Sequence, residues 1–240
     1  MIYWIVRVMI RVLFDLLVDW SVSGLDHFPQ QGPALLVNNH LSLLDPPLIL
    51  IALPIKMRVF AADKWQHGPI GFLLRHVGGA IFVRRGEVDR HALQQALEAL
   101  KRGEILGIAP EGTRSRTGTL QHGKPGVAFV ASKANVPLIP VVVYGTEQGF
   151  WPLLRLHRPR MRLVIGEPFR LPEFNANGTG KKSDRLQIQM DYIMNRLAAL
   201  LPAEYRGVYS GNLGKFKGIQ ENPEINPEII EAPSSSPEFP

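Results

Sequence analysis

The stretch ALLVNNHLSLLDPP, residues 34–47, places an apolar run, a histidine and the expected start of a helix in direct succession. Residues 34–37 are continuously apolar, as strands buried on both faces of a sheet are. His40 follows this run closely, and Asp45 precedes two prolines, which suit the first turn of a helix. A side chain just past a strand end lies where α/β sheets place their active sites. We therefore predict an α/β fold with a candidate site at His40.

The same alternation continues along the chain. Short apolar runs and segments of helical periodicity follow one another, which indicates a single α/β domain whose mostly parallel or mixed sheet is flanked by helices. The predicted strands are residues 34–37, 57–61, 80–83, 105–109, 138–143 and 161–165. The predicted helices are residues 47–52, 65–76, 89–101, 126–134 and 184–201.

The N-terminal segment is apolar but carries charges at a regular spacing. Residues 2–18 are interrupted only by Arg7, Arg11 and Asp15. Steps of four residues drift by about 40° on a helix, so these charges form one slanting stripe on an otherwise apolar surface. Three central charges make a membrane span unfavourable, whereas a helix in the headgroup region satisfies both halves of the pattern. We predict that residues 1–20 form an amphipathic membrane-association helix. A helix packed on the protein's own core is the alternative.

The charges of this chain are unevenly distributed. The 240 residues carry a net charge of +6, and the sequence pI is about 9.7. Residues 219–240 contain five Glu and no Lys or Arg, so the preceding residues carry about +11. The basic body suits an anionic membrane surface, and it lacks the interleaved aromatic and basic pattern of a nucleic-acid stacking surface. We predict no nucleic-acid partner, and a disordered acidic, Pro-rich tail over residues 219–240.

Two more predicted strands end in residues suited to an anion. Residues 105–109 run into Pro-Glu-Gly-Thr-Arg, which ends at Arg114, and residues 80–83 run into Arg84 and Arg85. Glycine lets a backbone approach a ligand closely, and arginine can grip two phosphate oxygens at once. Either motif by itself is equally typical of a solvated turn. Together with His40, they indicate a site built at three strand ends.

Four motifs therefore occur in order along residues 25–170. They are the pair His40-x4-Asp45, the stretch 79–85, the stretch 111–114, and Val-Pro-Leu-Ile-Pro-Val at 136–141. In order and approximate spacing they resemble the motifs of the 1-acyl-sn-glycerol-3-phosphate acyltransferase family. The resemblance implies that residues 21–218 form an acyltransferase domain.

The resemblance also implies residue roles. His40 is expected to be the general base and Asp45 its orienting partner. The expected substrate-binding residues are Arg85, Glu111, Gly112, Thr113, Arg114 and Lys124. Two positions depart from the family pattern, since many members carry Asp or Asn where Arg84 stands and Phe where Ala109 stands. The first departure leaves the identity of the acceptor open.

The expected reaction moves a fatty acyl chain from acyl-CoA or acyl carrier protein to the free hydroxyl of 1-acyl-sn-glycerol-3-phosphate, giving phosphatidic acid in phospholipid biosynthesis. No cofactor or metal is expected, because the acyl thioester is a co-substrate and the His residues form no close ligand pair. The chain has no Cys and no Gly-x-Ser-x-Gly motif, so neither provides a nucleophile. The expected location is monotopic, on the cytoplasmic face of a membrane.

Two alternatives stay open. The first is an acyltransferase of the same family that uses glycerol 3-phosphate or another lysophospholipid. The second is a protein without catalytic activity that binds anionic lipid through the N-terminal helix and the arginines. The pair of His40 and Asp45 favours an enzyme, because simple attraction between charges requires neither residue.

Overall fold

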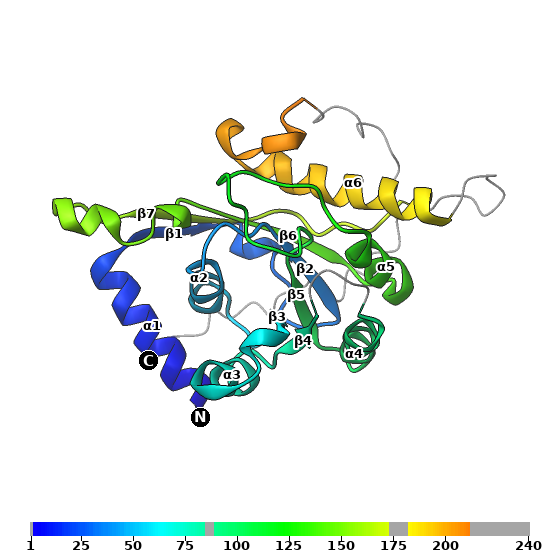
Figure 1. The fold of residues 1–240 in the computed structure, drawn as a ribbon, viewed down its shortest axis with the longest axis horizontal. Helices are drawn as coiled ribbons and strands as arrows, with labels where there is room; N and C mark the ends of the chain where they lie inside the picture. The colour runs from blue at the N-terminus through cyan, green and yellow to red at the C-terminus, as the bar shows by residue number, and fades with distance from the viewer. Residues whose placement is uncertain (1, 85–88, 173–181, 212–240) are drawn as a thin grey trace.

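A computed structural model describes residues 2–84, 89–172 and 182–211, and these residues form one seven-stranded sheet with helices on both faces (Figure 1). The strands are β1 (Asp19–Ser23), β2 (Ala34–Asn38), β3 (Arg58–Ala62), β4 (Ile81–Val83), β5 (Ile105–Ile108), β6 (Leu138–Tyr144) and β7 (Arg160–Ile165). Their order across the sheet is β1-β7-β6-β2-β5-β3-β4. All neighbours are parallel except β6 and β7. The predicted mixed sheet is therefore confirmed.

Helices bury both faces of this sheet, which explains why its central strands are apolar along almost their whole length. The helices are α1 (Ile2–Leu17), α2 (Asp45–Ala52), α3 (Gly68–His76), α4 (Arg90–Lys101), α5 (Pro125–Ala134) and α6 (Lys182–Leu200). Leu35 and Val37 pack into the core beneath α4, α5 and α6, whereas Leu36 packs into the core beneath α1 and α2. Alternate side chains of a strand point to opposite faces, so both sets must be apolar.

The six predicted strands and the five predicted helices after residue 20 are confirmed, with shifts of up to three residues at most ends. Residues 2–17 are helical as well, and their role at a membrane stays a prediction. Strand β1 was not predicted, because no apolar run in the sequence marks it. Its residues, Asp-Trp-Ser-Val-Ser, are half polar because the strand lies at an edge of the sheet and pairs only with β7. The predicted tail at 219–240 lies outside the described residues.

Helix α1 packs against α2 with one side only. Tyr3 and Phe14 are buried on that side. Arg7 also points inward, donating from Nε to the carbonyl of Leu50 at 3.1 Å and from Nη2 to that of Leu53 at 2.9 Å. It thereby satisfies carbonyls at the end of α2 that have no partner within that helix.

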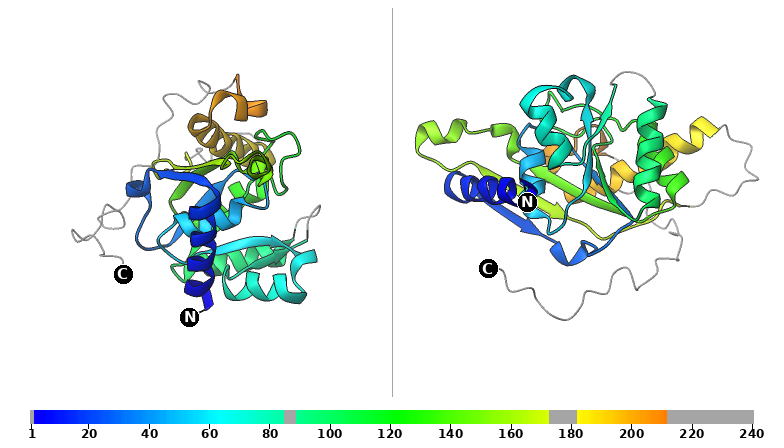
Figure 2. Two further views of the ribbon diagram at one scale, coloured as in Figure 1. Left: turned by 90° about the vertical axis from the view of Figure 1, so that its left-hand side faces the viewer. Right: turned by 90° about the horizontal axis from the view of Figure 1, so that it is seen from below.

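The placement of Arg7 corrects one part of the expected charged stripe. Arg7 turns inward, whereas Arg11 and Asp15 are exposed and lie 3.5 Å apart at the border of an exposed apolar face. This outer face consists of Ile2, Trp4, Ile5, Val8, Met9, Val12, Leu13 and Leu16. Figure 2 (left) shows α1 on the outside of the molecule, facing the viewer. Among the helices that the structure describes, none is both long enough and apolar enough to cross a bilayer.

Candidate active site at the carboxyl ends of the central strands

His40 and Asp45 meet directly after β2. Nδ1 of His40 lies 2.7 Å from Oδ2 of Asp45, and Asp45 is the first residue of α2. The chain turns between them because the same oxygen accepts the main-chain N–H of Leu41 at 2.7 Å and that of Ser42 at 2.8 Å. The turn brings together two side chains that a regular helix would hold about 140° apart.

The hydrogen bonds of Asp45 assign the tautomer of His40. Asp45 is fully buried, and its other oxygen, Oδ1, accepts the hydroxyl of Thr146. Every partner of this carboxylate other than the ring is a donor, so the ring nitrogen facing it must donate as well. The proton therefore sits on Nδ1, which leaves Nε2 as an acceptor. The side chain of His40 is 16% exposed, so the ring is accessible from solvent.

Glu111, which follows β5, holds the main chain of His40. Its Oε1 accepts the N–H of His40 at 3.0 Å, and its Oε2 accepts the N–H of Gln121 at 3.1 Å. The residue is 2% exposed. Burial raises the pKa of Glu111 to about 7, although the two N–H donors act in the opposite direction. The expectation that Glu111 contacts the substrate stays a prediction, because this geometry directs both oxygens to the protein's own main chain.

Ser115 fixes the same loop from its other end. The N–H of Ser115 donates to the carbonyl of His40 at 2.8 Å, so the loop after β5 engages both main-chain groups of His40. The Ser115 hydroxyl donates to the carbonyl of Thr119 at 2.7 Å and accepts the N–H of the same residue at 3.2 Å. The loop is therefore a folded support for the histidine.

Two of the cations expected in the site, Arg114 and Lys124, are exposed on the loop that follows β5. Arg114 adjoins Ser115, is exposed, and makes no ion pair or hydrogen bond within the described part of the chain. Gly112 has φ +68°, and a Cβ there would lie 3.0 Å from the side chain of Lys124. The structure thus brings Lys124 beside Gly112, a close approach that requires glycine. Thr113 is exposed between them.

The arginines after β4 are less fully described. The main-chain N–H of Arg84 donates to Asp89 at 3.1 Å, and its side chain lies 4.0 Å from the same carboxylate. Arg85 lies outside the described residues. No group of three or more His, Asp or Glu side chains within the described ranges is arranged to hold a metal ion.

Sequence reasoning missed two buried residues of this site. Thr146 lies 101 positions from its partner Asp45, just after β6. Asn39 exchanges two hydrogen bonds with the main chain of Val143, at 2.7 and 2.8 Å, and so joins the ends of β2 and β6. Their positions were the one signal in the sequence that could have identified them. Both follow apolar strands, and parallel pairing brings the carboxyl ends of those strands together.

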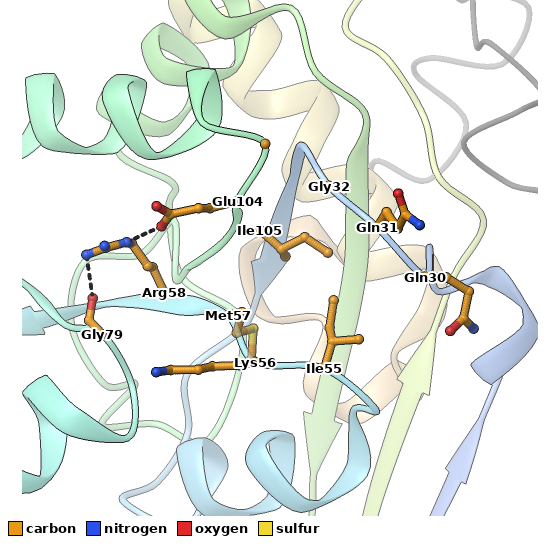
Figure 3. Close-up of a pocket in the computed structure, with 11 residues that line it drawn as sticks. Gln30, Gln31, Gly32, Ile55, Lys56, Met57, Arg58, Gly79, Glu104 and Ile105 are labelled. Carbon is orange, nitrogen blue, oxygen red and sulfur yellow. Dashed lines mark hydrogen bonds and ion pairs between the residues drawn. The ribbon is translucent and has the colours of Figure 1, made fainter. Parts of the chain in front are cut away.

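A cavity of about 610 Å³ lies at the amino ends of the central strands, opposite the carboxyl ends that carry His40 (Figure 3). It is lined by residues that precede β2, β3 and β5, such as Gly32 and Met57, together with Ile105. Arg58 spans the gap between Glu104 and the carbonyl of Gly79, as Figure 3 shows. Because these strands are parallel, the cavity is separated from His40 by the length of the strands.

Comparisons with known proteins identify the family of this chain. The sequence model of the family described as Acyltransferase matches residues 19–144, which include His40, Asp45, the 111–114 loop and Lys124. This chain belongs to the acyltransferase family. The predicted resemblance is thereby confirmed, and the matched region ends with β6.

Named members of the acyltransferase family are similar to this chain. A 1-acyl-sn-glycerol-3-phosphate acyltransferase of Borreliella burgdorferi is 28% identical over 131 residues, which cover 54% of this chain and 52% of that protein. A chloroplastic enzyme of the same name from Arabidopsis thaliana is 33% identical over 131 residues, covering 52% and 36%. The chain thus matches about half or less of the length of these relatives.

A solved structure extends the similarity to most of the fold. The crystal structure of the 1-acyl-sn-glycerophosphate acyltransferase PlsC from Thermotoga maritima superposes with a TM-score of 0.59 at 25% identity. It covers 81% of this chain and 78% of that one.

Proposed function

We propose that this chain is an O-acyltransferase that moves a fatty acyl group from a thioester to the free hydroxyl of 1-acyl-sn-glycerol-3-phosphate. The observation that carries the proposal is the hydrogen bond of 2.7 Å between His40 and a fully buried Asp45 at the carboxyl end of β2. The names of the similar proteins support this choice of acceptor. The donor is an acyl thioester of coenzyme A or of acyl carrier protein.

The mechanism follows from the tautomer of His40. Nε2 accepts the proton of the acceptor hydroxyl as the oxygen attacks the thioester carbonyl. The negative charge of Asp45 stabilises the resulting imidazolium and keeps the ring in place. When the tetrahedral intermediate collapses, the C–S bond breaks and the imidazolium returns the proton to the departing thiolate. No covalent acyl-enzyme is required.

Replacing the base tests this mechanism. His40→Ala removes nearly all acyl transfer, and because it takes one donor from the buried Asp45, the free energy of unfolding should fall by about 1.5–3 kcal/mol while the protein still folds. His91→Ala is the matched control, since His91 is exposed on α4, on the far face of the sheet. The measurement is release of free thiol from acyl-CoA in the presence of lysophosphatidate. Substantial turnover by His40→Ala would refute the assignment of the base.

The acceptor phosphate binds to the cations beside this base. Arg114 is exposed and unpaired within the described residues, and Lys124 packs against Gly112 in the same loop. A guanidinium meets two phosphate oxygens in one plane, whereas an ammonium acts as a point charge. Arg85 is proposed as a further phosphate ligand on the basis of the family motif.

Arg114 variants test recognition of the phosphate. Arg114→Ala removes a charge-assisted contact worth roughly 1.5–3 kcal/mol, or about 10- to 150-fold in kcat/KM for lysophosphatidate. Arg114→Lys restores part of this loss, and Arg116→Ala, an exposed arginine two positions away, is the matched control. An acceptor without a phosphate group should be used equally by Arg114→Ala and the parent. Equal losses on both acceptors would show that Arg114 supports the fold or the donor instead.

The enzyme reaches its lipid acceptor through the outer face of α1. That face carries eight exposed apolar side chains bordered by Arg11 and Asp15, and burying it in the headgroup region removes exposed apolar surface from water. Met9→Ser combined with Leu16→Ser should weaken flotation with anionic vesicles and leave the fold intact, because both residues are more than 60% exposed. Unchanged flotation would favour another role for this face.

A further inference from the structure

The most exposed large apolar side chains of the described residues belong to a short arm between β6 and β7. We define the η4 arm as residues 150–156, which contain the 3₁₀ helix Trp151–Arg155. Trp151, Leu154 and Leu156 are 76%, 75% and 96% exposed. Single exposed apolar residues are common, but three such side chains gathered at one tip indicate a binding surface.

The backbone of Leu156 supports this interpretation. Leu156 has a φ of +57°, in the left-handed region that costs an ordinary side chain roughly 1–2 kcal/mol. Glycine or asparagine would end the 3₁₀ helix with less strain. Burial of the Leu156 side chain does not offset this backbone cost, since the side chain is 96% exposed. Its side chain therefore lacks a packing role within the described structure.

The arm is held against the end of α1. Nη2 of Arg158 donates to the carbonyl of Asp15 at 2.6 Å and also to the carbonyl of Val18. The main-chain N–H of Asp19 donates to the carbonyl of Pro159 at 3.0 Å. Figures 1 and 2 show the arm projecting from the same side of the molecule as α1. The exposed tip and the apolar outer face of α1 therefore lie on the same side of the molecule, joined through the root of the arm at Arg158 and Pro159.

Basic residues surround the root of the arm. Arg155 and Arg158 are exposed, and Arg160, whose side chain is 80% exposed, lies 3.6 Å from Asp19. Asp19 also lies 3.2 Å from Arg162, and Asp15 lies 3.5 Å from Arg11, so five arginines here outnumber two carboxylates. The tip therefore combines Trp and Leu with an excess of Arg, which is typical of segments at the interface of an anionic bilayer.

We infer that the η4 arm is a second membrane-insertion element, which places Trp151, Leu154 and Leu156 among the acyl chains of an anionic bilayer beside α1. The inference rests on the proposed function, because a lipid acceptor requires the enzyme to work at a bilayer. The arm begins four residues after Thr146, whose hydroxyl binds Asp45. Insertion at both elements therefore fixes the sheet edge that carries His40 relative to the membrane.

Vesicle binding by the full-length chain tests the arm without relying on turnover. Trp151→Ser, Leu154→Ser and Leu156→Ser, combined in one variant, should lower the partition coefficient on vesicles of phosphatidylglycerol and phosphatidylcholine roughly tenfold or more. The matched control combines Ile188→Ser and Val208→Ser, which are exposed apolar residues outside this surface. Equal partitioning of the arm variant and the parent would overturn the inference.

A fluorescence measurement locates the tip directly. A variant with Trp4→Phe, Trp20→Phe and Trp65→Phe leaves Trp151 as the single tryptophan. Its emission should shift to the blue and be quenched when the vesicles contain lipids brominated on their acyl chains. Emission unaffected by brominated lipid would overturn the inference even if α1 still holds the protein on the vesicle.

The activity readout separates this inference from the proposed function. The arm variant should lose kcat/KM on a bilayer-embedded acceptor and retain it on a short-chain soluble acceptor. If neither acceptor is used by the parent, the proposed function fails, while vesicle binding and quenching still test the arm. If the parent forms dimers that the arm substitutions dissociate, and vesicle binding is unchanged, the arm binds a second copy of the chain and the inference is wrong.

Discussion

Asp45 and Glu111 are two buried carboxylates at the ends of neighbouring strands, yet they hold His40 in different ways. Asp45 accepts the ring N–H, two main-chain N–H groups and the Thr146 hydroxyl. Glu111 accepts only two main-chain N–H groups, one of them from His40 itself. The first carboxylate fixes the ring, and the second fixes the backbone from which the ring projects.

Glu111 shows what burial does to a carboxylate that two main-chain donors hold. A carboxylate removed from water loses its hydration, and hydrogen bonds from the protein must replace it. Glu111 has two such bonds, and its pKa rises to about 7. The ring contact of Asp45 is the one that bears on proton transfer, whereas Glu111 affects the reaction through the position of the main chain.

The largest expected effect comes from Asp45→Asn. The amide oxygen can keep the three N–H donors on the Oδ2 side, and the amide N–H₂ can donate to Thr146, so the tautomer of His40 is preserved. The variant then loses only the negative charge that stabilises the imidazolium. We expect kcat to fall roughly 10²- to 10³-fold with little change in acceptor KM. Steady-state kinetics checks this, and a kcat within tenfold of the parent would contradict the comparison.

The second prediction concerns the pH dependence of stability. The pKa of Glu111 is about 7 in the folded protein and near its ordinary 4.5 in the unfolded chain, so the folded state binds more protons between these values. The free energy of unfolding therefore falls as pH rises from about 4.5 to 7. Glu111→Gln lacks this titration, so the stability difference between parent and variant should change by about 3 kcal/mol over that range.

Urea unfolding at a series of pH values measures this difference. Glu98→Gln is the matched control, because it makes the same chemical change at an exposed position on α4. The contrary outcome is a difference in unfolding free energy between Glu111→Gln and the parent that stays constant from pH 4.5 to 7. That result would show that folding does not raise the pKa of Glu111, and the prediction would be wrong.

The third prediction removes one donor from Asp45. Thr146→Val keeps the shape of a fully buried residue but leaves Oδ1 of Asp45 without its hydroxyl partner. We expect a loss of about 1.5–3 kcal/mol in stability and a fall in kcat of less than tenfold, since the ring contact remains. Thr146→Ser should restore most of both quantities. Failure of Ser to restore them would point to a packing defect instead.

The smallest effect is expected at Ser115. Ser115→Ala removes the hydroxyl that organises Thr119 and Gln121 but retains the main-chain bond to His40. Stability should fall by about 1 kcal/mol, and kcat should stay within a few-fold of the parent. A large loss of kcat would mean that the support under Glu111 controls the base more strongly than Asp45 does.

Local patterns in the sequence were enough to predict most of the elements and the motif that carries the candidate site. Apolar runs, two of them interrupted by Arg58 and Arg162, predicted six of the strands because burial on both faces of a sheet favours such runs. His40 and Asp45 were found because their contact is local, made through a turn of five residues. Strand β1 lacked this signal, since an edge strand is half exposed and can be polar.

Only the tertiary structure decided which distant residues complete the site and which face of α1 is exposed. Glu111 and Thr146 reach His40 and Asp45 across 71 and 101 positions, so their roles depend on strand order, which local patterns do not encode. Arg7 turned inward because the end of α2 offers carbonyls without partners, and a buried hydrogen-bonded guanidinium satisfies them. The outer face of α1 and the tip of the η4 arm lie on the same side of the molecule, which only the folded chain shows.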